Sequence, residues 1–207
     1  MKRIAIVISS QSGQTQKIAD RISTQLKHGN CLVDVLTVEF DQVVSEARLK
    51  QYDAVILGCP VYLGDFPQML LDWAWEHRDT LNTVPTGLFT ESLNAADPRP
   101  RARVVDDKVL RTFIDQTDLR PRFVACFAGA LEYTQYSFFK KCVLQGMSAA
   151  AGGPTDTSRD FELTDWSDVA GFTQAFKDQD TRSGFAAINR LPVVSDHVWS
   201  LTFPSVA

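Results

Sequence analysis

The sequence has few cysteines and histidines and no long apolar run, and each shortage excludes a class of protein. Its 207 residues contain 4 cysteines and 3 histidines. No two cysteines form a C-x-x-C pair, so neither a zinc site nor a disulfide scaffold is expected. No run approaches the roughly 18 apolar residues of a membrane-spanning helix, and the apolar stretch before Ser9 is too short for the core of a signal peptide. We therefore expect a cytoplasmic protein whose thiols stay reduced.

An excess of positive charge is also missing. The chain has 21 Lys and Arg against 25 Asp and Glu, a net charge of −4 at pH 7. Proteins whose main partner is nucleic acid usually carry a basic surface, so no nucleic-acid partner is expected. With 44% hydrophobic and 22% charged residues, the composition is that of an ordinary globular protein that can bury a core without metals or disulfides.

What the sequence does contain is a regular alternation of apolar runs and helical patterns. Continuous apolar runs, typical of strands that are covered on both faces, occur at residues 4–8, 31–38, 54–59, 86–90 and 123–128. Helical spacing of apolar residues predicts helices over 14–27, 41–50, 68–81, 104–116, 134–147 and 165–177. This alternation predicts an α/β fold with a doubly wound, five-stranded parallel sheet and helices on both faces.

Two stretches do not fit the simple alternation. Residues from about 131 to 162 follow the fifth expected strand and indicate an insertion. The tail carries Val198, Trp199 and Phe203, which makes it too apolar for a solvated end, so we expect it to pack on the domain or on a second subunit. The predicted organisation is one domain over residues 1–178, which includes the insertion, and a C-terminal extension over 179–207.

The stretch after the first expected strand is unusually polar. Residues 9–15 read SSQSGQT, and a helical pattern follows at once. Ligands of parallel sheets bind beyond the carboxyl ends of the strands, and a helix N-terminus favours an anion. The hydroxyls of Ser10, Ser12 and Thr15 and the backbone at Gly13 can surround a phosphate. Because the loop has no Lys or Arg, it suits a phosphate monoester better than a triphosphate. The alternative is a helix cap, with Ser12 as the capping residue and Thr15 behind it.

A strand, then Ser/Thr-x-Ser/Thr-Gly-x-Thr, then a helix resembles the FMN phosphate loop of flavodoxin-like proteins. The residues that match are Ser10, Gln11, Ser12, Gly13, Gln14 and Thr15. The resemblance implies a flavodoxin-like fold in which these side chains and their backbone N–H groups hold the phosphate of FMN.

Two later loops resemble the loops that flank the flavin in the same proteins. The residues that the resemblance assigns to the flavin are Pro60, Val61, Tyr62, Leu63, Gly64, Ser92, Leu93 and Asn94. It implies that Tyr62 stacks on the ring system and that Gly64 allows close backbone approach. The alternative is that Tyr62 and Phe66 seal the start of the next helix. The carboxylate of Glu91 would disfavour extra negative charge on a reduced flavin, or it would point to solvent.

Two segments of the C-terminal third narrow the resemblance. AGALEY at residues 128–133 and GGPTDTSRDFELTDWSDVAGF at residues 152–172 resemble the menaquinone-dependent protoporphyrinogen IX dehydrogenase family, whose members are of the long-chain flavodoxin type. This resemblance implies an FMN-dependent oxidoreductase that passes electrons from a porphyrinogen to a quinone. Such an enzyme needs no Ser-His-Asp or Cys-His arrangement, and the sequence suggests none.

Two other functions stay open. An electron carrier of the flavodoxin type would have no substrate of its own and would dock on a redox protein, which the acidic residues Asp65, Glu91 and Asp97 favour. An interaction module that has lost FMN is the second, and the intact hydroxyl-rich loop argues against it.

A peripheral contact with the inner face of the cell membrane would use the insertion, where Lys140 and Lys141 adjoin apolar residues. The apolar tail would suit a homo-oligomer.

Overall fold

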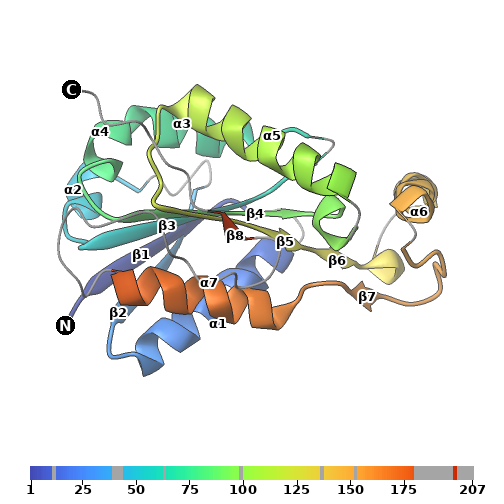
Figure 1. Ribbon diagram of the computed structural model, residues 1–207, viewed down its shortest axis with the longest axis horizontal. Coiled ribbons are helices and arrows are strands. Elements are labelled where there is room, and N and C mark those ends of the chain that lie inside the picture. The colour runs from blue at the N-terminus through green and yellow to red at the C-terminus, as the bar shows by residue number, and fades with distance from the viewer. Residues whose placement is uncertain are drawn as a thin grey trace.

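The computed structural model of the chain describes residues 1–10, 13–38, 44–62, 64–97, 100–135, 138–151, 153–179 and 198–199. Five parallel strands form its centre (Figure 1): β1 (Arg3–Ile8), β2 (Leu32–Thr37), β3 (Ala54–Pro60), β4 (Thr86–Ser92) and β5 (Phe123–Ala128). Their spatial order is β2-β1-β3-β4-β5, and every neighbouring pair among them is parallel. The predicted doubly wound parallel sheet is therefore confirmed.

The sheet also has a sixth strand that the sequence did not predict. β8 (Val198–Trp199) lies beside β5 and runs antiparallel to it, with Val124 opposite Trp199. This pair places one short piece of the C-terminal extension on the domain. Residues 180–197 and 200–207 lie outside the described residues, so the packing of the rest of the extension stays a prediction.

Helices cover both faces of the sheet, as predicted (Figure 1). α1 (Gln14–His28) and α7 (Trp166–Gln179) lie on one face, where Ile18 and Ile22 join Phe172 and Phe176 in a buried core with β1, β3 and β5. The helices on the other face are α2 (Glu46–Leu49), α3 (Gln68–Glu76), α4 (Arg78–Leu81) and α5 (Pro100–Thr117). All residues of β3, β4 and β5 are buried, because helices cover the strands on both sides.

Several elements differ from their predicted bounds; the helix expected over 104–116 begins at Pro100, and the one expected over 134–147 spans Phe138–Ala151. The helix expected over 68–81 is divided at His77, whose imidazole stacks on Trp73 with ring centroids 4.9 Å apart. β4 continues two residues beyond the predicted end, because Glu91 and Ser92 stay in register with Phe127 and Ala128 of β5. This extension moves Glu91 from a loop into the sheet.

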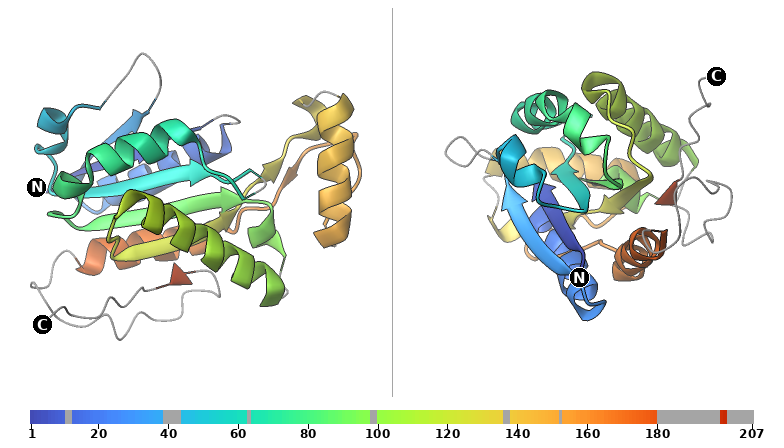
Figure 2. Two further views of the ribbon diagram at one scale, coloured as in Figure 1. Left: turned by 90° about the horizontal axis from the view of Figure 1, so that it is seen from above. Right: turned by 90° about the vertical axis from the view of Figure 1, so that its left-hand side faces the viewer.

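The insertion begins and ends on a small antiparallel ladder between β6 (Ala130–Leu131) and β7 (Phe161–Glu162). Between these strands lie a short 3₁₀ turn, η2 (Tyr133–Gln135), and α6 (Phe138–Ala151). Figure 2 shows α6 standing beyond the carboxyl ends of the strands, away from the layered body. None of the helices in the described part of the chain is long and apolar enough to cross a membrane.

Candidate functional site

The candidate site lies at the point where the strand order reverses. The chain leaves β1 toward β2 and leaves β3 in the opposite direction toward β4, and such a divergence opens a crevice at the carboxyl ends of the strands. Backbone hydrogen bonds join the segments there. The N–H of Ser9 donates to the carbonyl of Gly58 at 3.1 Å, and the N–H of Val61 donates to the carbonyl of Glu91 at 2.7 Å. The three predicted loops therefore meet at one edge of the sheet.

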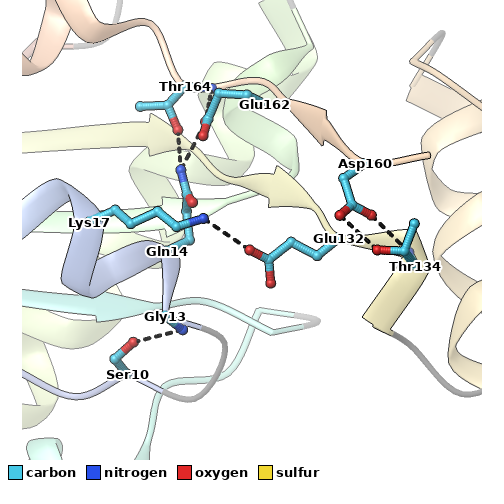
Figure 3. A network of polar contacts seen from close by, with 9 residues as sticks. All are labelled: Ser10, Gly13, Gln14, Lys17, Glu132, Thr134, Asp160, Glu162 and Thr164. Atoms are coloured by element: carbon cyan, nitrogen blue, oxygen red, sulfur yellow. Dashed lines mark hydrogen bonds and ion pairs between the residues drawn. The ribbon is translucent and has the colours of Figure 1, made fainter.

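Among the described residues, no side chain caps the N-terminus of α1. The capping position is Gly13 rather than Ser12, with φ +85° and ψ −15°, a left-handed conformation that favours glycine. No side chain accepts a hydrogen bond from the first turn at this position. The Gly13 N–H instead donates to Ser10 Oγ at 3.2 Å, as Figure 3 shows. The helix-cap alternative depends on Ser12, which, like Gln11, lies outside the described residues, so it stays open.

The side chain of Gln14 points away from the loop and into the protein. Its Nε2 donates to Glu162 Oε1 and to Thr164 Oγ1, both at 2.9 Å (Figure 3). Gln14 is 1% exposed, and its Oε1 is a buried atom with no hydrogen-bond partner in the described part of the protein. Only its backbone is therefore presented to a ligand in this arrangement, although the resemblance assigned the whole residue to the phosphate.

The hydroxyl of Thr15 is also engaged with the protein. Thr15 is buried, and its Oγ1 donates to Glu91 Oε2 at 3.2 Å. A hydroxyl carries one proton, so this bond and a bond from the same hydroxyl to a phosphate exclude each other. For the Thr15 hydroxyl to donate to a phosphate, as predicted, Glu91 must first give up this hydrogen bond.

Glu91 lies in a closely fitted pocket. Its side chain is buried, and a Cβ built at Gly129 would lie 1.9 Å from Glu91 Oε1, so only glycine fits beside this carboxyl. The pKa of Glu91 is raised to about 7. Burial is the largest cause, the carboxylates of Glu132 and Glu162 add to it, and the hydrogen bond from Thr15 opposes it. The expectation that Glu91 could point to solvent is wrong, and sequence reasoning missed its position because it ended β4 too early.

The nearest described basic side chain of α1 is directed elsewhere. Lys17 Nζ forms an ion pair with Glu132 Oε1 at 3.0 Å (Figure 3), and 53% of its side chain is exposed. Glu91, Glu132 and Glu162 form what we call the acidic cluster. It lies beneath the N-terminus of α1, where the helix dipole alone offers positive potential.

The second loop presents an aromatic side chain at the edge of the site. Pro60 ends β3 and is buried, and Val61 follows half-buried. Tyr62 and Asp65 exchange backbone hydrogen bonds of 3.0 and 2.9 Å across a tight turn that includes Gly64 at φ +90°. The Tyr62 side chain is 38% exposed, whereas Leu63 lies outside the described residues.

The alternative for this loop was that Tyr62 and Phe66 seal the start of the next helix, and the structure supports it for Phe66. Its ring packs edge-on against Phe113 of α5 with centroids 5.0 Å apart. Phe66 therefore seals the start of α3, while Tyr62 stays at the surface. The two aromatic residues have separate positions, which leaves Tyr62 accessible to a planar ligand.

The third loop is held by its own side chains. Ser92 is buried at the end of β4, and its Oγ accepts a hydrogen bond of 3.3 Å from the N–H of Ala95. This bond closes the 3₁₀ turn η1 (Asn94–Ala96). Leu93 and Asn94 are half-buried, so they are the predicted residues of this loop with surface left for a ligand.

Other catalytic chemistry finds no support at this site. No group of three or more His, Cys, Asp or Glu side chains that could hold a metal occurs among the described residues. Cys59 lies next to Pro60 in β3, but its thiol is buried and its pKa is strongly raised by desolvation, with Glu91 adding to the shift. A thiol in that state is a poor nucleophile.

The N-terminus of α1 begins at the left-handed Gly13, and the half-exposed Tyr62 lies on the neighbouring loop. This arrangement fits a ligand with a phosphate monoester and a planar ring. The fit is incomplete at Thr15, whose hydroxyl is occupied by Glu91. Among the motif's hydroxyl residues that the structure describes, Thr15 is buried and Ser10 is half-buried.

Comparisons with known proteins agree with this geometry. A family model described as "Flavodoxin domain" matches residues 5–158. The chain is 28% identical over 169 residues to a protoporphyrinogen IX dehydrogenase (quinone) of Escherichia coli strain K12, covering 82% of this chain and 91% of that protein. It is 29% identical over 175 residues to a Leishmania major protein of the same name, covering 83% and 73%. Among solved structures it is similar to oxidised flavodoxin 1 from Bacillus cereus, with a TM-score of 0.45, 20% identity and coverage of 70% and 95%.

Proposed function

The chain belongs to the flavodoxin domain family, and from that premise we propose that it is an FMN-dependent oxidoreductase that passes electrons from a porphyrinogen, protoporphyrinogen IX in particular, to a quinone. The observation that carries the proposal is the N-terminus of α1, led by the left-handed Gly13, at the switch point of the sheet that also holds the Tyr62 turn. The choice of donor and acceptor rests on the name that the curated relatives carry.

In this proposal the N–H groups of the first turn of α1 bind the phosphate, and the helix dipole stabilises its charge. Gly13 lets the chain enter the helix without a side chain in the way, and Ser10 fixes the Gly13 N–H. Gln11 and Ser12 remain predicted phosphate ligands. FMN, when bound, supplies the redox chemistry, and the protein supplies position and electrostatics.

The ring system would lie between the two later loops. Tyr62 would stack on it, and the backbone of Pro60, Val61 and Gly64 would line its edge, with Leu63 as a further predicted contact. Leu93 and Asn94 would border the other side. Ser92 would hold that loop by accepting the Ala95 N–H, and because accepting this bond does not use the hydroxyl proton, Ser92 remains a predicted contact.

One observation favours a second candidate function. Asp65, in the same turn as Tyr62, is exposed, and Glu162 is exposed on the strand that bounds the insertion. Exposed carboxylates around a flavin edge would attract a basic redox protein. The second candidate is therefore an electron carrier of the flavodoxin type, without a small-molecule substrate of its own.

A quinone acceptor would also require the protein to reach a membrane surface. We infer that the insertion would make this contact, because α6 stands away from the body beyond the candidate site (Figure 2). Its described side chains Lys141 and Leu144 are both half-buried. Co-sedimentation with anionic lipid vesicles, with and without residues 138–151, would test this contact, and analytical ultracentrifugation would test whether the chain forms a homo-oligomer.

The decisive experiment has two stages. The protein is purified without added flavin, its visible absorption is recorded, and any released cofactor is identified by mass. The loaded protein is then mixed anaerobically with protoporphyrinogen IX, followed by a menaquinone analogue. We expect FMN at about one per chain, loss of the 450 nm band with the donor and its return with the quinone.

A matched pair of variants tests the phosphate site. Thr15→Val removes the buried hydroxyl at the N-terminus of α1, and Thr24→Val removes an exposed hydroxyl of the same helix. FMN affinity should fall in the first variant and stay unchanged in the second. Flavin that binds but is reduced only by a redox protein would favour the electron carrier. Failure to bind any flavin would overturn both functions and favour an interaction module.

A further inference from the structure

Glu91 is the one buried acid beneath the candidate phosphate site that the proposed function does not use. It is 8% exposed, and it contacts the hydroxyl of Thr15 on one side and the backbone of Gly129 on the other. A nonpolar residue would fill this pocket at less cost, because a buried carboxylate needs compensation that its surroundings do not give. We therefore asked what Glu91 could do when a ligand arrives.

The charged groups around Glu91 are mostly of its own sign. Glu132 follows β6 and Glu162 ends β7, and both raise the pKa of Glu91. The one described cation of the network, Lys17 on α1, is paired with Glu132. From β3, Cys59 faces Glu91 as a neutral thiol whose pKa is raised. A phosphate dianion at the N-terminus of α1 would therefore add negative charge above the acidic cluster, and the one described cation of the network is already paired with Glu132.

The hydrogen bond between Thr15 and Glu91 gives the pocket two alternative states. With Glu91 ionised, the Thr15 hydroxyl donates to the carboxylate, at the observed 3.2 Å. With Glu91 protonated, the carboxyl can donate to Thr15 Oγ1, and the Thr15 proton then becomes available to another acceptor. Only the second state lets Thr15 hydrogen-bond a phosphate oxygen.

We propose that Glu91 takes up one proton from solvent when a phosphate monoester binds at the N-terminus of α1, and that the protonated carboxyl then donates to Thr15 Oγ1 so that the Thr15 hydroxyl donates to the phosphate. Glu91 is thus a positioning residue, which acts through Thr15. The proposal deepens the proposed function and rests on it. The site accepts a dianion without Lys or Arg because binding neutralises an acid in the floor of the site.

Two observations support this coupling. The pKa of Glu91, raised to about 7, leaves the group close to half-protonated near neutral pH, so uptake of a proton costs little. Thr15 and Glu91 are both buried and are joined directly by the 3.2 Å hydrogen bond, so a change in the protonation of Glu91 acts on the Thr15 hydroxyl without an intermediate group.

The test is the pH dependence of flavin affinity. Flavin-free protein is titrated with FMN between pH 7.5 and 8.5, where a phosphate monoester is already a dianion because its second pKa is about 6. Uptake of one proton predicts that the Kd for FMN rises by up to ~10-fold over this one pH unit. Titration calorimetry at pH 8 in two buffers of different ionisation enthalpy should give close to one proton taken up per FMN.

Three controls identify the group that takes up the proton. Glu91→Gln keeps the shape of the side chain and can donate to Thr15, so its Kd for FMN should stay nearly constant with pH, without proton uptake. Glu76→Gln removes the same charge at an exposed position at the C-terminus of α3 and should behave as the wild type. Riboflavin, which lacks the phosphate, should bind the wild type without proton uptake.

Each outcome decides between the proposals. A wild type that binds FMN with a flat pH profile overturns the role of Glu91 and leaves the proposed function in place. A Glu91→Gln variant that keeps the wild-type slope assigns the proton to the phosphate itself and also overturns it. If no protein binds FMN at any pH, the proposed function fails and the coupling fails with it. If Glu91→Gln does not fold, the infrared difference spectrum of the wild type on FMN binding decides, because a protonated carboxyl adds a C=O band that a protonated phosphate does not.

Discussion

Replacing Glu91 by glutamine should change how the stability of the flavin-free protein depends on pH. The structure raises the pKa of Glu91 from 4.5 to about 7, so the folded state holds a proton that the unfolded state has lost between these values. The free energy of unfolding must then fall as the pH rises through this window and level off above about pH 7. Between pH 5 and pH 8 the loss amounts to roughly 2–3 kcal/mol for a shift of this size.

Urea unfolding at pH 5 and pH 8, followed by circular dichroism, measures this loss. We expect Glu91→Gln to gain roughly 2–3 kcal/mol over the wild type on going from pH 5 to pH 8, because glutamine does not ionise. Any effect of the substitution that does not depend on pH, such as an altered hydrogen bond to Thr15, cancels in this difference. Glu76→Gln, at an exposed position, serves as the control. The reasoning is refuted if the difference between Glu91→Gln and the wild type is the same at both pH values.

Three further substitutions test the site at other points. Gly129→Ala should lower the free energy of unfolding by about 2–3 kcal/mol, because the new Cβ would lie 1.9 Å from Glu91 Oε1; in a Glu91→Ala background the loss should fall below about 1 kcal/mol, as a urea double-mutant cycle would show. Gly13→Ala should cost about 1–2 kcal/mol in the same assay, since its φ of +85° is unfavourable for alanine although nothing lies within 4 Å of the new Cβ. Tyr62→Ala should weaken FMN binding about 5- to 10-fold in a fluorescence titration, with little change in stability, whereas Trp75→Ala, at another exposed aromatic position, should leave the Kd for FMN unchanged.

The sequence was sufficient for the five parallel strands because their signal is local. Continuous apolar runs such as residues 54–59 and 123–128 gave β3 and β5 nearly to the residue, and the helical spacing before Gly29 gave the end of α1. The end of β4 was missed because Glu91 and Ser92 are polar. Their place in the sheet depends on pairing with β5, which no local pattern encodes.

The polar contacts of the candidate site were unpredictable for a related reason. The motif correctly located the N-terminus of α1, but it could not show where the side chains of Gln14 and Thr15 point. Thr15 contacts a residue 76 positions away in the sequence, and Gln14 contacts one 150 positions away. Such pairs arise only when the sheet and the insertion bring distant segments together, so the sequence indicated the backbone of the site and not the state of its hydroxyls.

The base of the insertion is part of the phosphate site, while its helix is not. Gln14 Nε2 donates to Glu162 and Thr164 on the returning segment (Figure 3). Thr164 Oγ1 in turn donates to the carbonyl of Ala128, at the end of β5, at 2.7 Å. Any ligand that moves the N-terminus of α1 must therefore act on β7, and a shift of β7 would move Glu162, one of the two carboxylates that raise the pKa of Glu91. α6 is joined to the body through β6 and β7, so the hydrogen bonds of Gln14 hold the base of the insertion against the N-terminus of α1.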